Sequence, residues 1–134
     1  MVHNAENLKK KYQHLNEAEN PVFKIQNDPR YTKVGKFLAH TALDEFPQLV
    51  NVIREEMSFV GPRPLPIAET ASIPLKYRSR FAVKPGITSS WVTAGQHKLA
   101  FSEWMSLDTQ YVLDQNTKYD LKIIITTLKL LLKI

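Results

Sequence analysis

The chain has 134 residues, of which 43% are hydrophobic and 23% are charged. This is the composition of one folded domain, and it excludes a wholly disordered chain. Cysteine is absent, which excludes disulfides, cysteine-ligated metals and thiol nucleophiles. The net charge of +5 favours anionic partners, such as phosphorylated substrates, nucleic acid or acidic lipid headgroups. No secretory leader and no run of about 18 apolar residues is visible, so we expect a chain that is soluble or bound to a membrane surface.

The first segments are expected to be short and mostly helical. Apolar residues recur at helical spacing among lysines and glutamates over residues 3–20, which predicts an exposed leader helix that ends at Pro21. Residues 22–25 form a short extended run, and residues 27–29 (Asn-Asp-Pro) indicate a turn. Residues 32–38 predict a short helix or turn.

A stronger helical pattern follows over residues 43–57. Its apolar residues repeat at three- and four-residue steps. Pro47 is compatible with a helix only near its first turn, so we expect the helix to begin shortly before that residue. Thr41 or Asp44 is then the predicted N-cap.

The central part alternates loops and short elements. Residues 61–66 contain three prolines and predict a stiff, extended loop, and residues 67–83 read as helical. A turn at residues 84–86 precedes a run of β-branched residues over 87–93, which predicts a small β element. Residues 100–115 carry aromatic and aliphatic residues on one stripe and predict another helix.

The last segment, residues 120–134, has the clearest periodicity. A wide apolar sector is bordered by lysines that share one helical face: Lys118, Lys122, Lys129 and Lys133. This pattern fits a helix that lies in the headgroup region of a membrane, with its ammonium groups pointing outward. A helix packed on the core of its own domain fits equally well.

An acidic pair, Asp44-Glu45, lies at the predicted start of the 43–57 helix. The positive end of a helix dipole stabilises carboxylates and also attracts phosphate. Next to a bound phosphoryl group, Asp44 could act as a nucleophile that forms an acyl-phosphate, or as a magnesium ligand. On spacing alone, simple capping of the helix is the plainer explanation.

Basic residues supply the matching charge. The loop Gly61-Pro62-Arg63-Pro64 holds a guanidinium, whose planar fork can grip two phosphate oxygens, although an ordinary ion pair with a carboxylate fits equally well. No acidic residue occurs between Glu69 and Glu103, a stretch that contains Lys76, Arg78, Arg80, Lys84 and Lys98. Such a stretch either concentrates anions or forms a solvated basic face.

Several blocks, taken in chain order, match one known pattern. They are Pro21-Val22-Phe23-Lys24-Ile25, Asn27-Asp28-Pro29-Arg30, Val34-Gly35-Lys36-Phe37-Leu38, Leu43-Asp44-Glu45-Phe46-Pro47-Gln48-Leu49-Val50-Asn51-Val52, Met57-Ser58-Phe59-Val60-Gly61-Pro62-Arg63-Pro64, Arg80, Lys84-Pro85-Gly86-Ile87-Thr88, Asp108 with Tyr111, and Asp120-Leu121 with Thr127. Together they resemble the bacterial sugar transferases that load polyprenyl phosphate, the monotopic phosphoglycosyl transferases. The resemblance covers roughly residues 20–130.

The resemblance implies that a nucleotide diphosphate sugar gives its sugar-1-phosphate to polyprenyl phosphate, in the assembly of surface polysaccharide or exopolysaccharide. By the same resemblance, Asp44 is the nucleophile and contacts Mg²⁺, and Glu45 assists it. Arg63 is implied to bind phosphate, and we assign Arg80 and Lys84 to the same phosphate- and substrate-binding set. The implied location is the cytoplasmic face of the bacterial inner membrane.

The sequence also departs from the family pattern. Ala39 stands where family members usually have an arginine, and residues 89–97 replace the run Gly-Trp-Ala-Gln-Val-Asn-Gly-Arg. The chain begins about where the Met of a Lys-x-Arg-[Ser/Thr]-Met block would stand. An alternative is therefore a catalytically impaired, truncated family member that acts as a nucleotide-sugar-binding or partner module.

We thus expect a mainly α (α+β) single domain over residues 1–134, with a leader helix over 1–20 and the catalytic portion over 21–134. Amphipathic helices should lie on a membrane surface, and a small β element should lie near residues 83–95. A homo-oligomer is compatible with this sequence. We expect no nucleic-acid partner, because no helix-turn-helix, zinc-finger or RNA-binding signature accompanies the basic residues.

Overall fold

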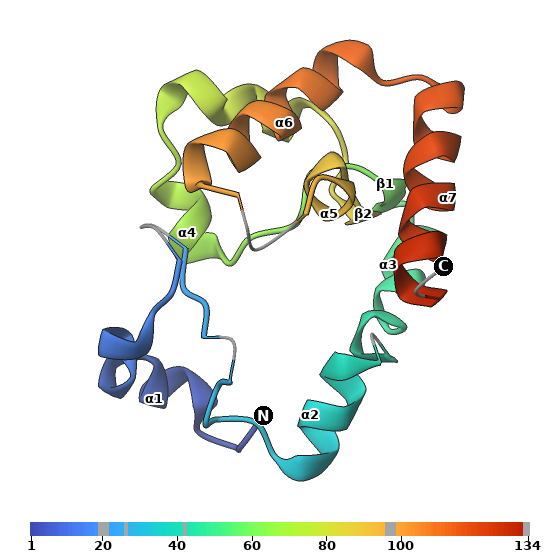
Figure 1. Ribbon diagram of the computed structural model, residues 1–134. Coiled ribbons are helices and arrows are strands. Elements are labelled where there is room, and N and C mark those ends of the chain that lie inside the picture. Colours follow the sequence, from blue (N-terminus) through green and yellow to red (C-terminus); the bar gives the residue numbers. More distant parts are fainter. Residues whose placement is uncertain (19–21, 26, 42, 96–98, 133–134) are drawn as a thin grey trace.

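The computed structural model describes the chain except for residues 19–21, 26, 42, 96–98 and 133–134 (Figure 1). The described part is mainly helical and contains one small parallel sheet, which confirms the predicted fold class. A search of the described residues finds no helix with the length and apolar character needed to span a bilayer.

The sheet has two short strands. Strand β1 (Ser58–Val60) pairs in parallel with β2 (Gly86–Thr88), with Ser58 opposite Gly86 and Val60 opposite Thr88. The chain between them contains helix α4 (Ile67–Ala71) and the 3₁₀ helix η3 (Leu75–Ala82). At Gly61 and Gly86 the two backbones touch, since a Cβ at Gly61 would overlap the Lys84 carbonyl and one at Gly86 would overlap the Gly61 nitrogen.

The predicted β element is correct in place but shorter than expected. The strand predicted over residues 87–93 ends at Thr88, because the Ser89 hydroxyl accepts a hydrogen bond from the Val92 amide and begins helix α5 (Ser90–Thr93). Its partner β1 carries no strand pattern of its own, since three residues are too few to show alternation.

The main core lies where helix α6 (Phe101–Asp114) packs on η3 and α5. Its buried members are Ile73, Trp91, Trp104 and Met105. The rings of Trp91 and Trp104 are stacked with their centroids 4.8 Å apart. The helix predicted over residues 100–115 is thus confirmed, and its apolar stripe forms the centre of the core.

The C-terminal helix α7 (Thr117–Leu132) packs along both strands and α5 (Figure 1). Ile123 is buried with Val60 and Tyr111, and the hydroxyls of Thr88 and Thr127 share a hydrogen bond of 2.6 Å. Six other apolar residues of this helix are exposed: Leu121, Ile125, Leu128, Leu130, Leu131 and Leu132. The helix therefore combines core packing with an unpacked apolar side.

The N-terminal part is less helical than residues 3–20 predict. It contains helix α1 (Ala5–Lys11) and the 3₁₀ helix η1 (Gln13–Leu15), and the helical part stops before Asn16. The side-chain oxygen of Asn16 accepts hydrogen bonds from the amides of Ala18 and Lys24. Asn16 thus folds the chain back, which a helix would not allow. Pro21, the predicted end of the leader helix, lies outside the described residues.

The leader is tied to the rest of the molecule by charged groups. The Arg30 guanidinium donates to the Asp28 carboxylate and to the Ala5 carbonyl, and Lys9 pairs with Glu69 on α4 at 3.1 Å. The hydrogen bonds from Arg30 hold the pKa of Asp28 below its usual range.

The segment from residue 33 to residue 53, here called the arm, contains α2 (Lys33–His40), the 3₁₀ turn η2 (Leu43–Glu45) and α3 (Gln48–Ile53). Figure 1 shows it running away from the sheet along one side of the molecule. No residue of η2 or α3 is buried. Its exposed apolar side chains are Val34, Phe37, Leu38, Leu43, Phe46, Leu49, Val50 and Ile53.

The single helix predicted over residues 43–57 is confirmed over Gln48–Ile53 and is wrong at both ends. Pro47, which has no amide hydrogen to donate, separates η2 from α3, so neither Thr41 nor Asp44 caps α3. Helix α3 then stops early: the Glu56 amide donates to the Asn51 carbonyl at 2.8 Å and the Glu55 amide to the Val52 carbonyl at 2.9 Å. This is a Schellman end, with Glu55 in the left-handed region at φ 61°.

Candidate active site

The acidic pair and the arginine loop meet at the junction of the arm with the sheet. The Arg63 guanidinium lies 3.7 Å from the Glu45 carboxylate, and the two side chains are 44% and 29% exposed. Glu45 also accepts a hydrogen bond from Gln48, one turn further along the arm. Two charged groups from segments 18 residues apart in sequence therefore share one partly open space.

Asp44 belongs to the same neighbourhood, as Tyr31 makes clear. Burial raises the pKa of the Tyr31 hydroxyl, and the negative charge of Asp44 raises it further. Arg63 acts on Tyr31 in the opposite direction. Asp44 directly precedes Glu45 in the chain, so its charge lies close to the ion pair that Glu45 forms with Arg63.

Lys24 adds a second cation to this region. Burial lowers the pKa of the Lys24 ammonium to about 8, the positive charge of Arg63 lowers it further, and Glu17 opposes the shift. The candidate active site thus centres on the Glu45–Arg63 ion pair, and Lys24, Tyr31 and Asp44 are candidate neighbours that interact with it electrostatically or adjoin it in the chain. Neither Lys24 nor Tyr31 was predicted as a site residue from the sequence, although Lys24 lies in one of the blocks that carried the resemblance.

The Arg63 side chain has a firm support. Its guanidinium lies over the Trp91 ring, 5.6 Å from the centroid, and Trp91 in turn stacks on Trp104. A planar cation above an indole face is held electrostatically while its edges remain free to donate hydrogen bonds.

Arg80 lies behind the loop, and its guanidinium is buried. The residue is 2% exposed, and its Nε and Nη2 atoms donate to Asp108 Oδ2 at 3.0 and 2.8 Å. Nη2 also donates to the Arg63 carbonyl at 2.7 Å. The structure therefore brings Arg80 to the main chain of the loop and not into the space between Arg63 and Glu45.

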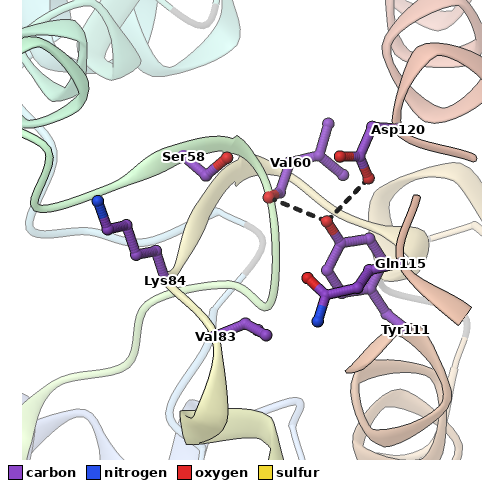
Figure 2. Close-up of a pocket in the computed structure, with 7 residues that line it drawn as sticks. All are labelled: Ser58, Val60, Val83, Lys84, Tyr111, Gln115 and Asp120. Carbon is purple, nitrogen blue, oxygen red and sulfur yellow. Dashed lines mark hydrogen bonds between the residues drawn. The ribbon is translucent and has the colours of Figure 1, made fainter. Parts of the chain in front are cut away.

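Lys84 lines a different pocket, of about 280 Å³, shown in Figure 2. The pocket is lined by Ser58, Val60, Val83, Lys84, Tyr111, Gln115 and Asp120. Neither the acidic pair nor Arg63 lines it. The Tyr111 hydroxyl donates to Asp120 and is also within 3.2 Å of the Val60 carbonyl, and burial raises its pKa.

The donor set of the acidic pair suits magnesium. Among the described residues, no three acidic or histidine side chains gather in a way that could hold a metal ion. Mg²⁺, however, usually takes only one or two protein carboxylates and completes its shell with water and substrate phosphates. The exposed Asp44 carboxylate, with Glu45 beside it, fits this requirement.

Comparison with known proteins gives consistent results. Residues 1–134 match the family described as "Bacterial sugar transferase". The chain is 40% identical over 129 residues to the galactosyl transferase CpsE of Streptococcus agalactiae, an alignment that covers 96% of this chain and 29% of the relative. It is 40% identical over 111 residues to the UDP-galactose-lipid carrier transferase of Erwinia amylovora, covering 83% of this chain and 23% of the relative.

A third relative has a name that spells out a reaction. This is the UDP-glucose:undecaprenyl-phosphate glucose-1-phosphate transferase of Escherichia coli, 38% identical over 110 residues, which cover 76% of this chain and 24% of the relative. The chain thus spans less than a third of the length of each of these three relatives. The match over all its residues shows that the chain belongs to the bacterial sugar transferase family.

Proposed function

We propose that this chain is the catalytic portion of a phosphoglycosyl transferase, which moves a sugar-1-phosphate from a nucleotide diphosphate sugar to polyprenyl phosphate. The observation that supports the proposal is the ion pair between Arg63 and Glu45, the residue directly after Asp44; in the proposal Asp44 is the nucleophile and Arg63 binds phosphate. The names of two relatives, which mention a UDP-sugar together with a lipid carrier or undecaprenyl phosphate, support the substrate class.

In the first step, a carboxylate oxygen of Asp44 attacks the phosphorus that bears the sugar. The bond from that phosphorus to the bridging oxygen breaks, and the nucleoside monophosphate leaves with the electron pair. An aspartyl-phosphosugar remains. In the second step, an oxygen of polyprenyl phosphate attacks the same phosphorus, and the Asp44 carboxylate is released as the lipid diphosphate sugar forms.

Charged neighbours serve this chemistry. Arg63 and Lys24 bind oxygens of the diphosphate and stabilise negative charge as it develops on the leaving group. The Arg63–Glu45 pair is partly exposed and long, so a phosphate can displace Glu45 from the guanidinium at little cost. Mg²⁺, held by Asp44 when bound, would supply further neutralisation of the diphosphate charge.

Peripheral attachment to the cytoplasmic face of the inner membrane forms part of the proposal. The exposed apolar residues of the arm and of α7 provide the area, and a lipid acceptor must reach Asp44 from the bilayer. We expect the double variant Phe46→Ser/Ile53→Ser to reduce flotation with anionic phospholipid vesicles by about ten-fold. The double variant Ile67→Ser/Leu75→Ser removes two strongly exposed apolar residues outside the arm and α7, and should float like the wild type. Equal flotation of both variants would contradict attachment through the arm.

The covalent step can be tested directly. Wild-type protein incubated with UDP-galactose or UDP-glucose and Mg²⁺ should gain the mass of one hexose phosphate and release one uridine monophosphate. Asp44→Asn should gain no mass, whereas Glu56→Gln, which changes an exposed acid after α3, should react normally. Calorimetric binding of the UDP-sugar without adduct or release would contradict catalysis and favour a nucleotide-sugar-binding module.

A further inference from the structure

Three buried residues of α6 lie on one face of the helix. Trp104, Asp108 and Tyr111 are spaced four and three positions apart, the spacing that stacks side chains on a helix. All three are almost completely buried. Each contacts a different part of the segment from Val60 to Arg63, either directly or through one intermediate residue.

Tyr111 reaches the start of that segment. Its hydroxyl lies 3.2 Å from the carbonyl of Val60, the last residue of β1, and 2.8 Å from Asp120 on α7 (Figure 2). The Tyr111 hydroxyl has one hydrogen, which its two acceptors share. The hydrogen bond to Asp120 holds the phenol in place, with its oxygen facing the Val60 carbonyl.

Asp108 reaches the end of the segment through Arg80. Both side chains are 1% exposed. The Nη2 atom of Arg80 donates hydrogen bonds both to the Asp108 carboxylate and to the Arg63 carbonyl. A fully buried ion pair is costly to desolvate and is a poor source of stability compared with apolar packing. Its clear geometric effect is to fix the main chain at Arg63.

Trp104 reaches the Arg63 side chain through Trp91. Its ring stacks on Trp91 at 4.8 Å, and the Arg63 guanidinium lies on the same indole at 5.6 Å. The position of the cation therefore depends on where α6 places Trp104.

We propose that this face of α6 is a positioning surface for Arg63: Tyr111 and the Asp108–Arg80 pair hold the main chain at Val60 and Arg63, and Trp104 supports the guanidinium through Trp91. The proposal rests on the proposed function, in which Arg63 binds the diphosphate. Trp104, Asp108, Tyr111 and Arg80 are positioning residues that do not touch the substrate. Arg80 thereby acquires a different role from the one that the sequence analysis assigns to it.

Such a surface matters because electrostatic stabilisation depends on placement. A displacement of about 1 Å at a charged group can lower a rate by about 100-fold. Polar groups held by buried hydrogen bonds also avoid the reorganisation that a flexible loop would need at each turnover.

The first test reads the position of Arg63 without any reaction. The chain has two tryptophans, so 5-fluorotryptophan labelling gives two ¹⁹F signals, and Trp104→Phe identifies the one from Trp91. Arg63→Ala gives the shift of the Trp91 signal when the guanidinium is gone. We expect Tyr111→Phe and Arg80→Lys to move the Trp91 signal toward that position. Tyr119→Phe, which removes a hydroxyl bonded to Ser90 on α5, should leave it in place.

The second test measures coupling to Arg63. In the wild-type background, Arg80→Lys and Tyr111→Phe should each lower the rate of adduct formation by about 5- to 20-fold. In the Arg63→Ala background, each should lower it less than about 2-fold, because the group being positioned is absent. Tyr119→Phe should have no effect in either background.

The outcomes separate the inference from the function. An unmoved Trp91 signal, or the same loss of rate with and without Arg63, overturns the positioning surface even if the wild type is active. A wild type that forms no adduct and releases no nucleotide overturns the proposed function, and the Trp91 signal then decides the inference alone. If Arg80→Lys does not fold, as judged by circular dichroism, Tyr111→Phe carries both tests, since it removes only one hydroxyl.

Discussion

The arm and the region behind the arginine loop differ in almost every physical respect. Neither η2 nor α3 buries a residue, and the arm leaves eight large apolar side chains exposed. The region formed by η3, β1, β2, α5 and α6, here called the scaffold, buries two stacked tryptophans and a fully enclosed ion pair. Asp44 and Glu45 are on the arm, and Arg63 is on the loop that follows β1 of the scaffold.

This difference shows that the cation and the carboxylates of the candidate site are held with different firmness. The cation is held by interactions that fix both its main chain and its ring support, so its position is set before a substrate arrives. The carboxylates are on a segment with few interior contacts, which under the proposed function could adjust its position as lipid and sugar nucleotide bind. Replacements in the two regions should therefore fail in different ways.

The largest effect is expected from Asp44→Asn in the arm. It should lower sugar-phosphate transfer by about a thousand-fold or more, because the amide is not a nucleophile. The midpoint of thermal unfolding should change by less than about 2 °C, since the residue is exposed. A large drop in the midpoint would show that the arm contributes to folding stability after all, and would weaken the contrast drawn here.

The opposite pattern is expected in the scaffold. Met105 has no exposed surface, so Met105→Ala should lower the free energy of unfolding by about 2–5 kcal/mol in urea titrations. Ile53 is 81% exposed in the arm, and Ile53→Ala should change the same quantity by no more than about 0.5 kcal/mol. Similar losses in the two variants would break the comparison.

The role of Lys24 in the candidate site can be tested by changing the pH. With its pKa near 8, raising the pH from 7 to 9 removes the ammonium charge, and the affinity for UDP should fall by roughly ten-fold in calorimetry. The folded pKa is below the unfolded value of 10.5, so the unfolded chain binds more protons between pH 8 and 10.5. This group therefore makes the fold more stable as the pH rises through that window. Weaker binding together with greater stability excludes unfolding as the cause, and Lys24→Met should lose both responses.

The smallest effect concerns the residue that joins the arm to β1. Glu55 adopts φ 61°, which costs a residue with a Cβ about 1 kcal/mol, whereas glycine adopts it freely. We expect Glu55→Gly to raise the free energy of unfolding by about 0.5–1 kcal/mol, with Glu56→Gly, at the next position, lowering it. A loss of stability in Glu55→Gly would mean that the glutamate side chain itself stabilises the junction.

The sequence predicted best where one physical signal acts alone. Helices α6 and α7 follow from their apolar spacing, and α2 falls where residues 32–38 predict a short helix or turn. The end of α3 was unpredictable because a glutamate occupies the position where glycine normally signals a Schellman end. Strand β1 exists only because β2 lies beside it, a contact that no local pattern encodes.

The candidate site was predictable only in part, again because contacts between residues far apart in the chain are not encoded by a local pattern. The resemblance pointed to Asp44, Glu45 and Arg63, of which Glu45 and Arg63 form an ion pair in the fold. Composition alone could not separate Arg63 from Arg80, since both are arginines in a basic stretch. What distinguishes them is Asp108, 28 residues further along the chain, which draws Arg80 into the interior. Lys24 and Tyr31 carry no sequence signal of their own for this site.

The contact between Gly61 and Gly86 has a consequence for substrate size. With the two backbones touching, neither position has room for a side chain, and the strands have no room to approach each other more closely. Under the proposed function, we therefore expect the loop that carries Arg63 to keep its place when sugars of different size bind. Substitutions that change the sugar preference should then accumulate on the side of α2 and α3.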